Sequence, residues 1–264
     1  MDIKSLSAFI LDMDGVLYRG GERLDGAREF LTFLRDRQYK FILLTNNATR
    51  TPEQVAERLQ QLGMPVPSER ILTSSVATAQ YLQKANPSGA RLFVIGEEGL
   101  RRPLADLGFT LSDDGPADYV VLGMDRMVTY DKLKRATLLI RAGAKFVATN
   151  PDLTFPTREG LVPGAGALAA ALTAATGVTP VVIGKPEPAA LQLALERMDA
   201  DPHTTAALGD RLDTDIEGGY RAGLPTILVL TGVATRQDMA NYHVQPTWVF
   251  TNLRALIDAL SRGH

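Results

Sequence analysis

The chain has 264 residues, which is long for one hydrophobic core and sufficient for two, and it carries a formal net charge of -2 with no cysteine. The near balance of charge gives no electrostatic footprint for nucleic acid or for an anionic membrane, so neither is an expected partner. The absence of cysteine excludes disulfides, thiolate metal sites and cysteine nucleophiles, and it suits a cytoplasmic protein.

The first third of the sequence predicts alternating strands and helices. Three apolar runs have the composition of short buried strands: residues 8–11, 40–44 and 70–73. Apolar side chains recur at helical spacing between and after these runs: residues 27–34, 51–62 and 74–82. Strands and helices joined by short connections form βαβ units, which imply a parallel sheet.

The same alternation restarts after a turn-forming cluster, Asn86–Gly89, as though a second domain begins there. Strands are predicted over residues 92–95, 119–122 and 145–148, and helices over residues 98–107, 130–142 and 166–175. After a break at 177–180, the pattern predicts strands over 181–183, 205–208, 226–229 and 248–250, and helices over 187–198 and 253–260. We therefore expect an α/β protein whose doubly wound parallel-sheet core is formed by residues 1–84 and 181–264, with an inserted α/β domain formed by residues 85–180.

Two features bear on the location of the protein. The first core strand begins by Ala8, which leaves no room for a signal peptide. The most apolar later stretch, residues 164–178, is too short to cross a bilayer, because a spanning helix needs about 20 apolar residues. We therefore expect a cytoplasmic protein with no membrane partner.

Asp12 and Asp14 follow the first predicted strand, separated by one residue. Two full charges about 4 Å apart repel by about 4 kcal/mol at an effective dielectric constant of about 20. A metal ion or a shared proton is the natural remedy, which makes a functional site the first hypothesis. The alternative is a pair of ordinary turn acids, since aspartate is common where strands end.

Polar residues also end two other predicted strands, Thr45 after the second and Asp210 after residues 205–208. Because the carboxyl ends of parallel strands lie along one edge of a sheet, where ligands bind, we expect these residues and Asp12 in one pocket. Four further polar residues are candidates for the same pocket: Asn46, Asn47, Lys185 and Asp215. This set of carboxylates, amides, a hydroxyl and one ammonium favours a hard divalent cation and an oxyanion substrate.

Magnesium fits this set best, because it takes oxygen ligands and binds through one or two carboxylates, waters and a substrate phosphate. Zinc is poorly served, because thiolates are absent and none of His203, His243 and His264 lies in these motifs. With a metal ion and Lys185 supplying positive charge, a phosphoryl group is the natural substrate, since its transfer depends on positioning and electrostatic stabilisation.

Four motifs resemble, in order and spacing, the signature motifs of the haloacid dehalogenase-like superfamily. They are Asp12-Met13-Asp14-Gly15-Val16, the strand-ending Thr45, Gly184-Lys185-Pro186, and Gly209-Asp210 followed by Asp215. The insertion between the second and third motifs resembles the α/β cap of subfamily IIA, whose members are p-nitrophenyl phosphatase-like, and the sequences at 149–152 and 163–166 are also similar. The resemblance covers the chain from Ala8 to the last predicted strand, and it implies a Rossmann-like core with a mobile cap over the active site.

The resemblance also implies a role for each site residue. Asp12 would be the nucleophile that forms an aspartyl-phosphate. Asp14 would protonate the departing alcohol, then activate the hydrolytic water, and offer its backbone carbonyl to the metal ion. Asp12 and Asp210 would bind Mg²⁺ directly and Asp215 would orient them, although the sequence leaves open whether Asp215 is itself a ligand. The residues that would hold the phosphate oxygens are Thr45, Asn46, Asn47 and Lys185.

The identity of the second acid separates the branches of this superfamily. Its dehalogenases lack that acid and the related ion pumps carry threonine there, so Asp14 indicates hydrolysis of a phosphate ester whose alkoxide needs a proton. The mutases of the superfamily have a small helical cap between the first and second motifs, and the interval 15–41 is too short for one.

The sequence thus predicts a Mg²⁺-dependent phosphatase that acts on a small phosphorylated metabolite. The alternative is a non-catalytic module that binds such a metabolite, although intact acids in the motifs argue against it. Phosphoglycolate, pyridoxal phosphate, nucleotides and sugar phosphates all stay open as substrates. Phe155, in the segment 150–156, is either a contact for an apolar part of the substrate or a core residue, and a homo-oligomer formed through the cap is a further open alternative.

Overall fold

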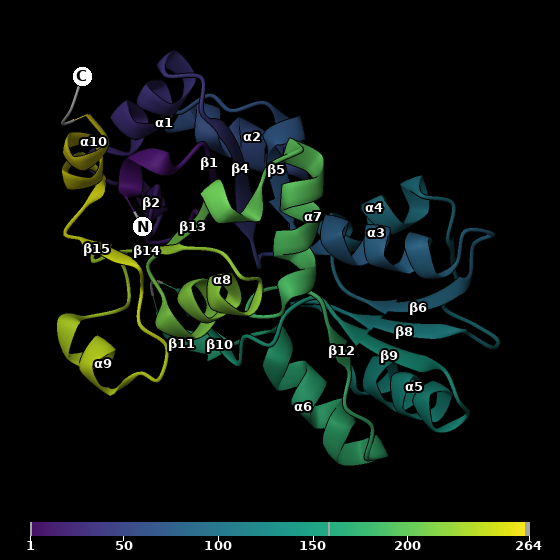
Figure 1. The fold of residues 1–264 in the computed structure, drawn as a ribbon. Helices are drawn as coiled ribbons and strands as arrows, with labels where there is room; N and C mark the ends of the chain where they lie inside the picture. The colour runs from purple at the N-terminus through teal and green to yellow at the C-terminus, as the bar shows by residue number, and fades with distance from the viewer. Residues whose placement is uncertain (1, 158, 262–264) are drawn as a thin grey trace. The chain divides into compact units, whose positions relative to one another are not determined.

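The computed structural model describes residues 2–157 and 159–261, which fall into two compact units (Figure 1). Of the described residues, the first unit holds 2–45, 55–72 and 185–261, and the second holds 46–54 and 73–184. Each unit is built on its own parallel sheet with helices, so the predicted α/β class is confirmed. Residues 46–54 and 73–84, which we assigned to the core, cluster with the second unit, and the role of that unit as a cap stays a prediction.

The first unit contains a six-stranded sheet in the order β15-β14-β13-β1-β4-β5. Its strands are β1 (Ala8–Leu11), β4 (Lys40–Thr45), β5 (Ile71–Thr73), β13 (Thr205–Gly209), β14 (Thr226–Val229) and β15 (Trp248–Phe250). β1 runs parallel to both of its neighbours, with Ile10 opposite Ala207 of β13 and Ile42 of β4. The carboxyl end of β1 therefore lies between the carboxyl ends of β13 and β4.

Helices cover this sheet on both faces. They are α1 (Ala27–Asp36), α2 (Pro52–Gln61), α7 (Pro188–Met198), α8 (Glu217–Arg221), α9 (Arg236–Asn241) and α10 (Leu253–Ser261). Phe30 of α1, Leu59 of α2 and Leu256 of α10 share one core with Phe9 and Leu11 of β1, whereas α7 packs against β4 and α8. Burial on both faces explains why β1 is apolar at every position rather than at alternate ones.

The second unit repeats this design with a five-stranded parallel sheet in the order β12-β9-β8-β6-β7. Its strands are β6 (Arg91–Ile95), β7 (Thr110–Leu111), β8 (Tyr119–Leu122), β9 (Lys145–Ala148) and β12 (Val181–Val182). Its helices are α3 (Ser74–Ala85), α4 (Glu98–Asp106), α5 (Tyr130–Arg141) and α6 (Ala165–Thr176). α3 packs against α4, and α5 packs against α6 over the sheet face that carries Phe93, Val120 and Phe146.

Three segments differ from the sequence prediction. The strand predicted over 181–183 is only β12, which lies at the edge of the second sheet and leaves Val181 49% exposed rather than buried. Two short strand pairs form in segments for which we predicted neither strands nor helices: β2 (Tyr18–Arg19) with β3 (Glu22–Arg23), and β10 (Thr154–Thr157) with β11 (Gly160–Pro163). The Gly20-Gly21 turn between β2 and β3 has positive φ at both residues, a geometry that glycine favours. Among the described residues, none of the helices combines the length and the apolar character needed to cross a membrane.

Candidate active site

Three of the predicted site residues lie where three neighbouring strands end. Asp12 follows β1, Thr45 is the last residue of β4, and Asp210 follows β13. The Asp12 amide donates to the carbonyl of Leu208 at 2.8 Å, so the ladder between β1 and β13 continues to the site itself. The buried parallel sheet thus brings together residues that are up to 198 positions apart in the sequence.

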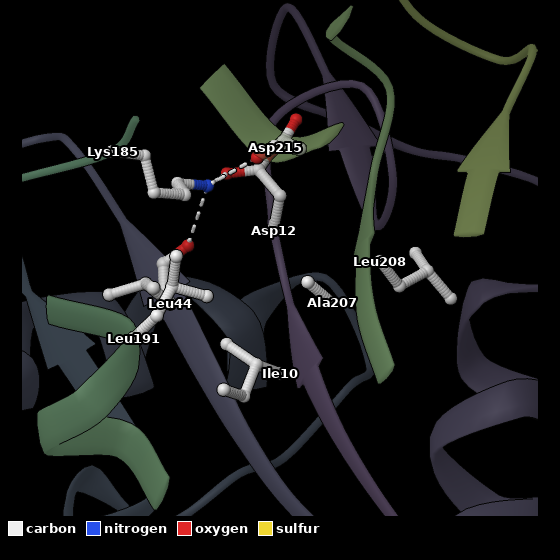
Figure 2. A pocket seen from close by; sticks show the side chains of 8 residues that line it. All are labelled: Ile10, Asp12, Leu44, Lys185, Leu191, Ala207, Leu208 and Asp215. Carbon is white, nitrogen blue, oxygen red and sulfur yellow. Dashed lines mark hydrogen bonds and ion pairs between the residues drawn. The ribbon is translucent and has the colours of Figure 1, made fainter. Parts of the chain in front are cut away.

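Lys185 lies at the centre of this site (Figure 2). Its Nζ donates to Oδ1 of Asp12 and to Oδ1 of Asp215, both at 2.6 Å, and to the carbonyl oxygen of Leu44 at 3.3 Å. The side chain is only 5% exposed. Burial lowers the pKa of Lys185, but the two carboxylates outweigh burial and raise the pKa above its ordinary value. Lys185 is therefore a fixed positive charge at the end of β1.

The carboxylates of Asp12, Asp210 and Asp215 form a cluster in which one oxygen of each lies within 4.8 Å of the others. Burial raises the pKa of Asp12 well above its ordinary range, with Lys185 opposing the shift and the other two carboxylates adding to it. Burial likewise raises the pKa of Asp210 to about 7, and the Asp215 carboxylate adds to this effect. Lys185 pairs with Asp12 and Asp215, and all three carboxylates lie close together, so a cation bound among them would offset their mutual repulsion.

Asp210 shows which oxygen is suited to such a cation. Its Oδ2 accepts the backbone N–H of Val233 at 2.7 Å, whereas its Oδ1 is buried and accepts no hydrogen bond from the described residues. Buried polar atoms are rarely left without a partner, because the lost hydration is costly. Carboxylate oxygens are the ligands that Mg²⁺ prefers, so the Asp12 and Asp210 side chains fit this metal.

Asp215 lies in a short π-helix, Leu212–Ile216, which periodicity gave no means of predicting. Both of its carboxylate oxygens already have donors, since Oδ1 accepts from Lys185 and Oδ2 accepts the backbone N–H of Arg211 at 3.1 Å. Asp213, two residues earlier, is exposed and pairs with the Arg211 guanidinium at 2.7 Å. This arrangement agrees with Asp215 acting through Lys185 and with Asp213 as a solvated loop acid.

Asp14 is exposed and lies outside the three-carboxylate cluster. Its Oδ2 accepts from the hydroxyl of Tyr18 at 3.5 Å, a long hydrogen bond. The turn between them is closed by the Gly15 amide, which donates to the carbonyl of Tyr18 at 2.8 Å, and Gly15 has a φ of +78°. The predicted contact of the Asp14 backbone carbonyl with a metal ion stays a prediction.

Asn46 and Asn47 directly follow Thr45 but belong to the second unit. The carbonyl of Asn46 accepts from Ser74 Oγ at 2.7 Å and from Asn150 Nδ2 at 2.8 Å, and its side-chain amide donates to the Asp152 carboxylate at 3.2 Å. The Oδ1 of Asn47 accepts from the backbone N–H and the hydroxyl of Thr49 at 2.9 and 2.8 Å. Contact of either amide with a phosphate group stays a prediction.

Two further observations concern residues away from the cluster. Phe155 is half-buried on β10, opposite Val162 of β11, so its predicted contact with the substrate also stays a prediction. The segment Thr231–Val233, which the sequence analysis did not single out, touches both Asp210 and Gly15. A threonine and a glycine after the buried strand β14 were an available signal, because β14 ends at the same sheet edge as β13.

Comparison with known proteins places these motifs in a recognised group. A family model described as haloacid dehalogenase-like hydrolase matches residues 9–110, and a second, described as HAD-hydrolase-like, matches residues 182–256. An acid sugar phosphatase of Staphylococcus aureus is 41% identical over 98% of this chain and 100% of its own length. Two solved structures are also similar: a 4-nitrophenylphosphatase of Thermotoga maritima (TM-score 0.93, 36% identity, 98% of this chain and 99% of that one) and NagD of Escherichia coli K-12 (TM-score 0.88, 36% identity, 96% and 98%).

Proposed function

We propose that this protein is a Mg²⁺-dependent phosphatase that forms an aspartyl-phosphate on Asp12. The chain belongs to the haloacid dehalogenase-like hydrolases, in the p-nitrophenyl phosphatase-like subfamily IIA, and it is a phosphoric monoester hydrolase. Its substrates are phosphate monoesters of small metabolites. The observation that carries the proposal is the cluster at the end of β1, where Asp12 and Asp215 pair with the ammonium of Lys185 and Asp210 lies close to both acids.

Asp12 is the nucleophile in this mechanism. Lys185 donates to its Oδ1 at 2.6 Å, which orients the carboxylate and leaves Oδ2 for attack on phosphorus. Attack forms a bond between this oxygen and phosphorus, and the bond from phosphorus to the ester oxygen breaks. Lys185 also stabilises the negative charge that spreads over the phosphoryl oxygens. Thr45, Asn46 and Asn47 are the other residues that we propose to hold those oxygens.

Asp14 moves the protons. Its carboxylic acid protonates the alkoxide as it leaves, and the resulting carboxylate then takes a proton from the water that attacks the aspartyl-phosphate. The second attack breaks the bond between phosphorus and Asp12, so inorganic phosphate is released and both aspartates return to their starting states. The exposure of Asp14 supports this role, because an exposed carboxyl is accessible to the departing alcohol and to the attacking water.

Asp12 and Asp210 are the residues that would hold Mg²⁺, together with the backbone carbonyl of Asp14. When bound, the ion supplies positive charge that offsets the charge of the phosphoryl group and of the clustered carboxylates. The buried Oδ1 of Asp210, which has no donor within residues 2–157 and 159–261, supports this assignment.

The substrate class follows from the relatives rather than from the cluster. The similarity to an acid sugar phosphatase makes sugar phosphates the first class to test, and we propose that the inserted domain, residues 85–180, selects the leaving group.

Hydrolysis of p-nitrophenyl phosphate and of a panel of sugar phosphates, with MgCl₂ or with EDTA, tests the proposal. We expect metal-dependent release of phosphate by the natural protein and its loss in Asp12→Asn. Absence of metal-dependent release across the whole panel would instead favour the non-catalytic binding module. Full activity of Asp12→Asn would refute the nucleophile assignment.

A further inference from the structure

The loop that follows β14 encloses the carboxylate of Asp210. Val233 donates its backbone N–H to Oδ2 at 2.7 Å. The α-carbon of Gly232 approaches so closely that a Cβ there would lie 1.8 Å from the same oxygen. Gly15, in the turn after Asp14, is also in contact, since a Cβ on it would lie 2.4 Å from Oδ2. The backbones of Gly15 and Gly232 thus pack against Oδ2 of Asp210, and any larger residue at either position would displace this oxygen.

Thr231 connects the loop that contains Gly232 with the turn that contains Gly15. Its hydroxyl donates to the carbonyl of Gly15 at 2.6 Å, across 216 positions of the sequence. The amide of Ala234 also donates to the backbone carbonyl of Asp210 at 3.0 Å, which fixes the same loop to the end of β13. The Oδ2 of Asp210 thus accepts a hydrogen bond from Val233, whereas its buried Oδ1 has no donor in the part of the chain that the structure describes.

We propose that Thr231, Gly232 and Val233 form a positioning clamp that holds Asp210 ready to bind the metal ion. The proposal rests on the proposed function, because it assumes that Oδ1 of Asp210 is a Mg²⁺ ligand. Without the clamp, rotation about the bond to the carboxyl group would exchange the two oxygens, and binding would have to stop that rotation. Groups that orient a metal ligand in this way typically change metal affinity by about 10-fold to 100-fold.

Thr231→Val tests the clamp, because it removes the hydroxyl while keeping a β-branched side chain of similar size. Thr231→Ser keeps the hydroxyl and serves as the rescue variant, and Thr110→Val makes the same chemical change at an exposed position on β7 of the second unit. The apparent Kd for Mg²⁺ is taken from the rise in Tm with MgCl₂ concentration in the absence of substrate. We expect Thr231→Val to raise this Kd about 10-fold, with Thr231→Ser and Thr110→Val close to the natural protein.

Gly232→Ala gives an independent test, since its methyl group must push the Asp210 carboxylate aside. We expect a larger rise in the Mg²⁺ Kd than in Thr231→Val, with phosphatase activity recovering in Thr231→Val at high MgCl₂. An unchanged Kd in Thr231→Val, accompanied only by a lower Tm without metal, would overturn the clamp and leave Thr231 with a structural role. The binding measurement needs no turnover, so a natural protein that binds Mg²⁺ but hydrolyses no ester would refute the proposed function alone. A natural protein without any Mg²⁺-dependent rise in Tm would overturn the clamp together with the metal site.

Discussion

Both units place acidic side chains where parallel strands end, but the balance of charge around those acids differs between the two units. In the second unit, buried Asp125 follows β8 and accepts the Met127 N–H at 2.8 Å and the Lys132 ammonium at 2.7 Å. Glu97, after β6, accepts both the backbone and the guanidinium of Arg126, and the guanidinium lowers the pKa of Glu97. Asp125 and Glu97 therefore each have a cation of their own.

The first unit leaves its acids short of cations at the corresponding edge. Lys185 pairs with Asp12 and Asp215, which lie close to Asp210, and Oδ1 of Asp210 has no donor among the described residues. Raised pKa values at Asp12 and Asp210 are the expected consequence of burying like charges together. The comparison teaches that a polar sheet edge is not itself evidence of a reactive site, whereas an uncompensated charge on that edge is.

The largest expected contrast lies between Asp12 in the first unit and Asp125 in the second. Asp12→Asn replaces the attacking carboxylate with an amide, and we expect kcat for p-nitrophenyl phosphate to fall by roughly 1,000-fold or more. Asp125→Asn leaves Lys132 without its carboxylate, so Tm should fall while kcat at saturating MgCl₂ stays in the range of the natural protein. Steady-state kinetics and thermal unfolding of both variants provide the measurement. Equal losses of kcat in Asp12→Asn and Asp125→Asn would contradict the assignment of the reactive site to the first unit alone.

The second contrast concerns the two lysines. Lys185→Met leaves Asp12 and Asp215 without the cation that they share, and breaking such a pair costs about 3 kcal/mol. Lys132 is 39% exposed, so Lys132→Met should cost only about 1 kcal/mol, because solvent screens its pair with Asp125. Urea unfolding measures both losses of stability. We also expect kcat to fall roughly 100-fold in Lys185→Met alone. A larger loss of unfolding free energy in Lys132→Met than in Lys185→Met would contradict the difference between the two units.

The site residues at the strand ends could be predicted from the sequence, whereas the contacts of the loop residues could not. The positions of Asp12, Thr45 and Asp210 follow from apolar runs that end in polar residues, because a parallel sheet aligns those ends. Periodicity carries no information on which side chain a loop residue will meet across 216 positions, as for Thr231 and Gly15.

Element boundaries set a second limit. Val181 and Val182 have the composition of a buried strand, yet they lie at a sheet edge, and the choice between edge and centre depends on the neighbouring strands rather than on local sequence. The π-helix at Leu212–Ile216 could not be predicted for the same reason, because its Asp215 contacts a distant residue, Lys185, rather than solvent.

A smaller contrast lies inside that π-helix. Asp215→Asn weakens one of the two carboxylate contacts that hold Lys185, and we expect kcat/KM to fall about 10-fold to 100-fold, as is typical for groups that orient a reactive residue. Asp213→Asn removes only an exposed pair with Arg211, for which the expected change is negligible. The two variants have the same charge change, so a simple loss of negative charge would affect them equally. Kinetics over a range of MgCl₂ concentrations separates a loss of metal affinity from a loss of turnover.

A further expected contrast is a pH dependence of stability in the metal-free protein. Asp210 has a pKa of about 7 in the folded protein, above its ordinary value, so the folded state holds this proton more tightly than the unfolded state. Its contribution to stability is complete below the unfolded pKa and is lost as the pH rises through 7, with a slope of at most about 1.4 kcal/mol per pH unit. The raised pKa of Asp12 acts in the same direction, whereas the lowered pKa of Glu97 in the second unit affects stability only at more acidic pH. Tm in EDTA should therefore fall between about pH 5 and pH 7, and saturating MgCl₂ or Asp210→Asn should flatten the profile. A profile in EDTA that rises with pH would mean that the clustered carboxylates are already compensated without a metal ion, and the contrast between the two sheet edges would then fail.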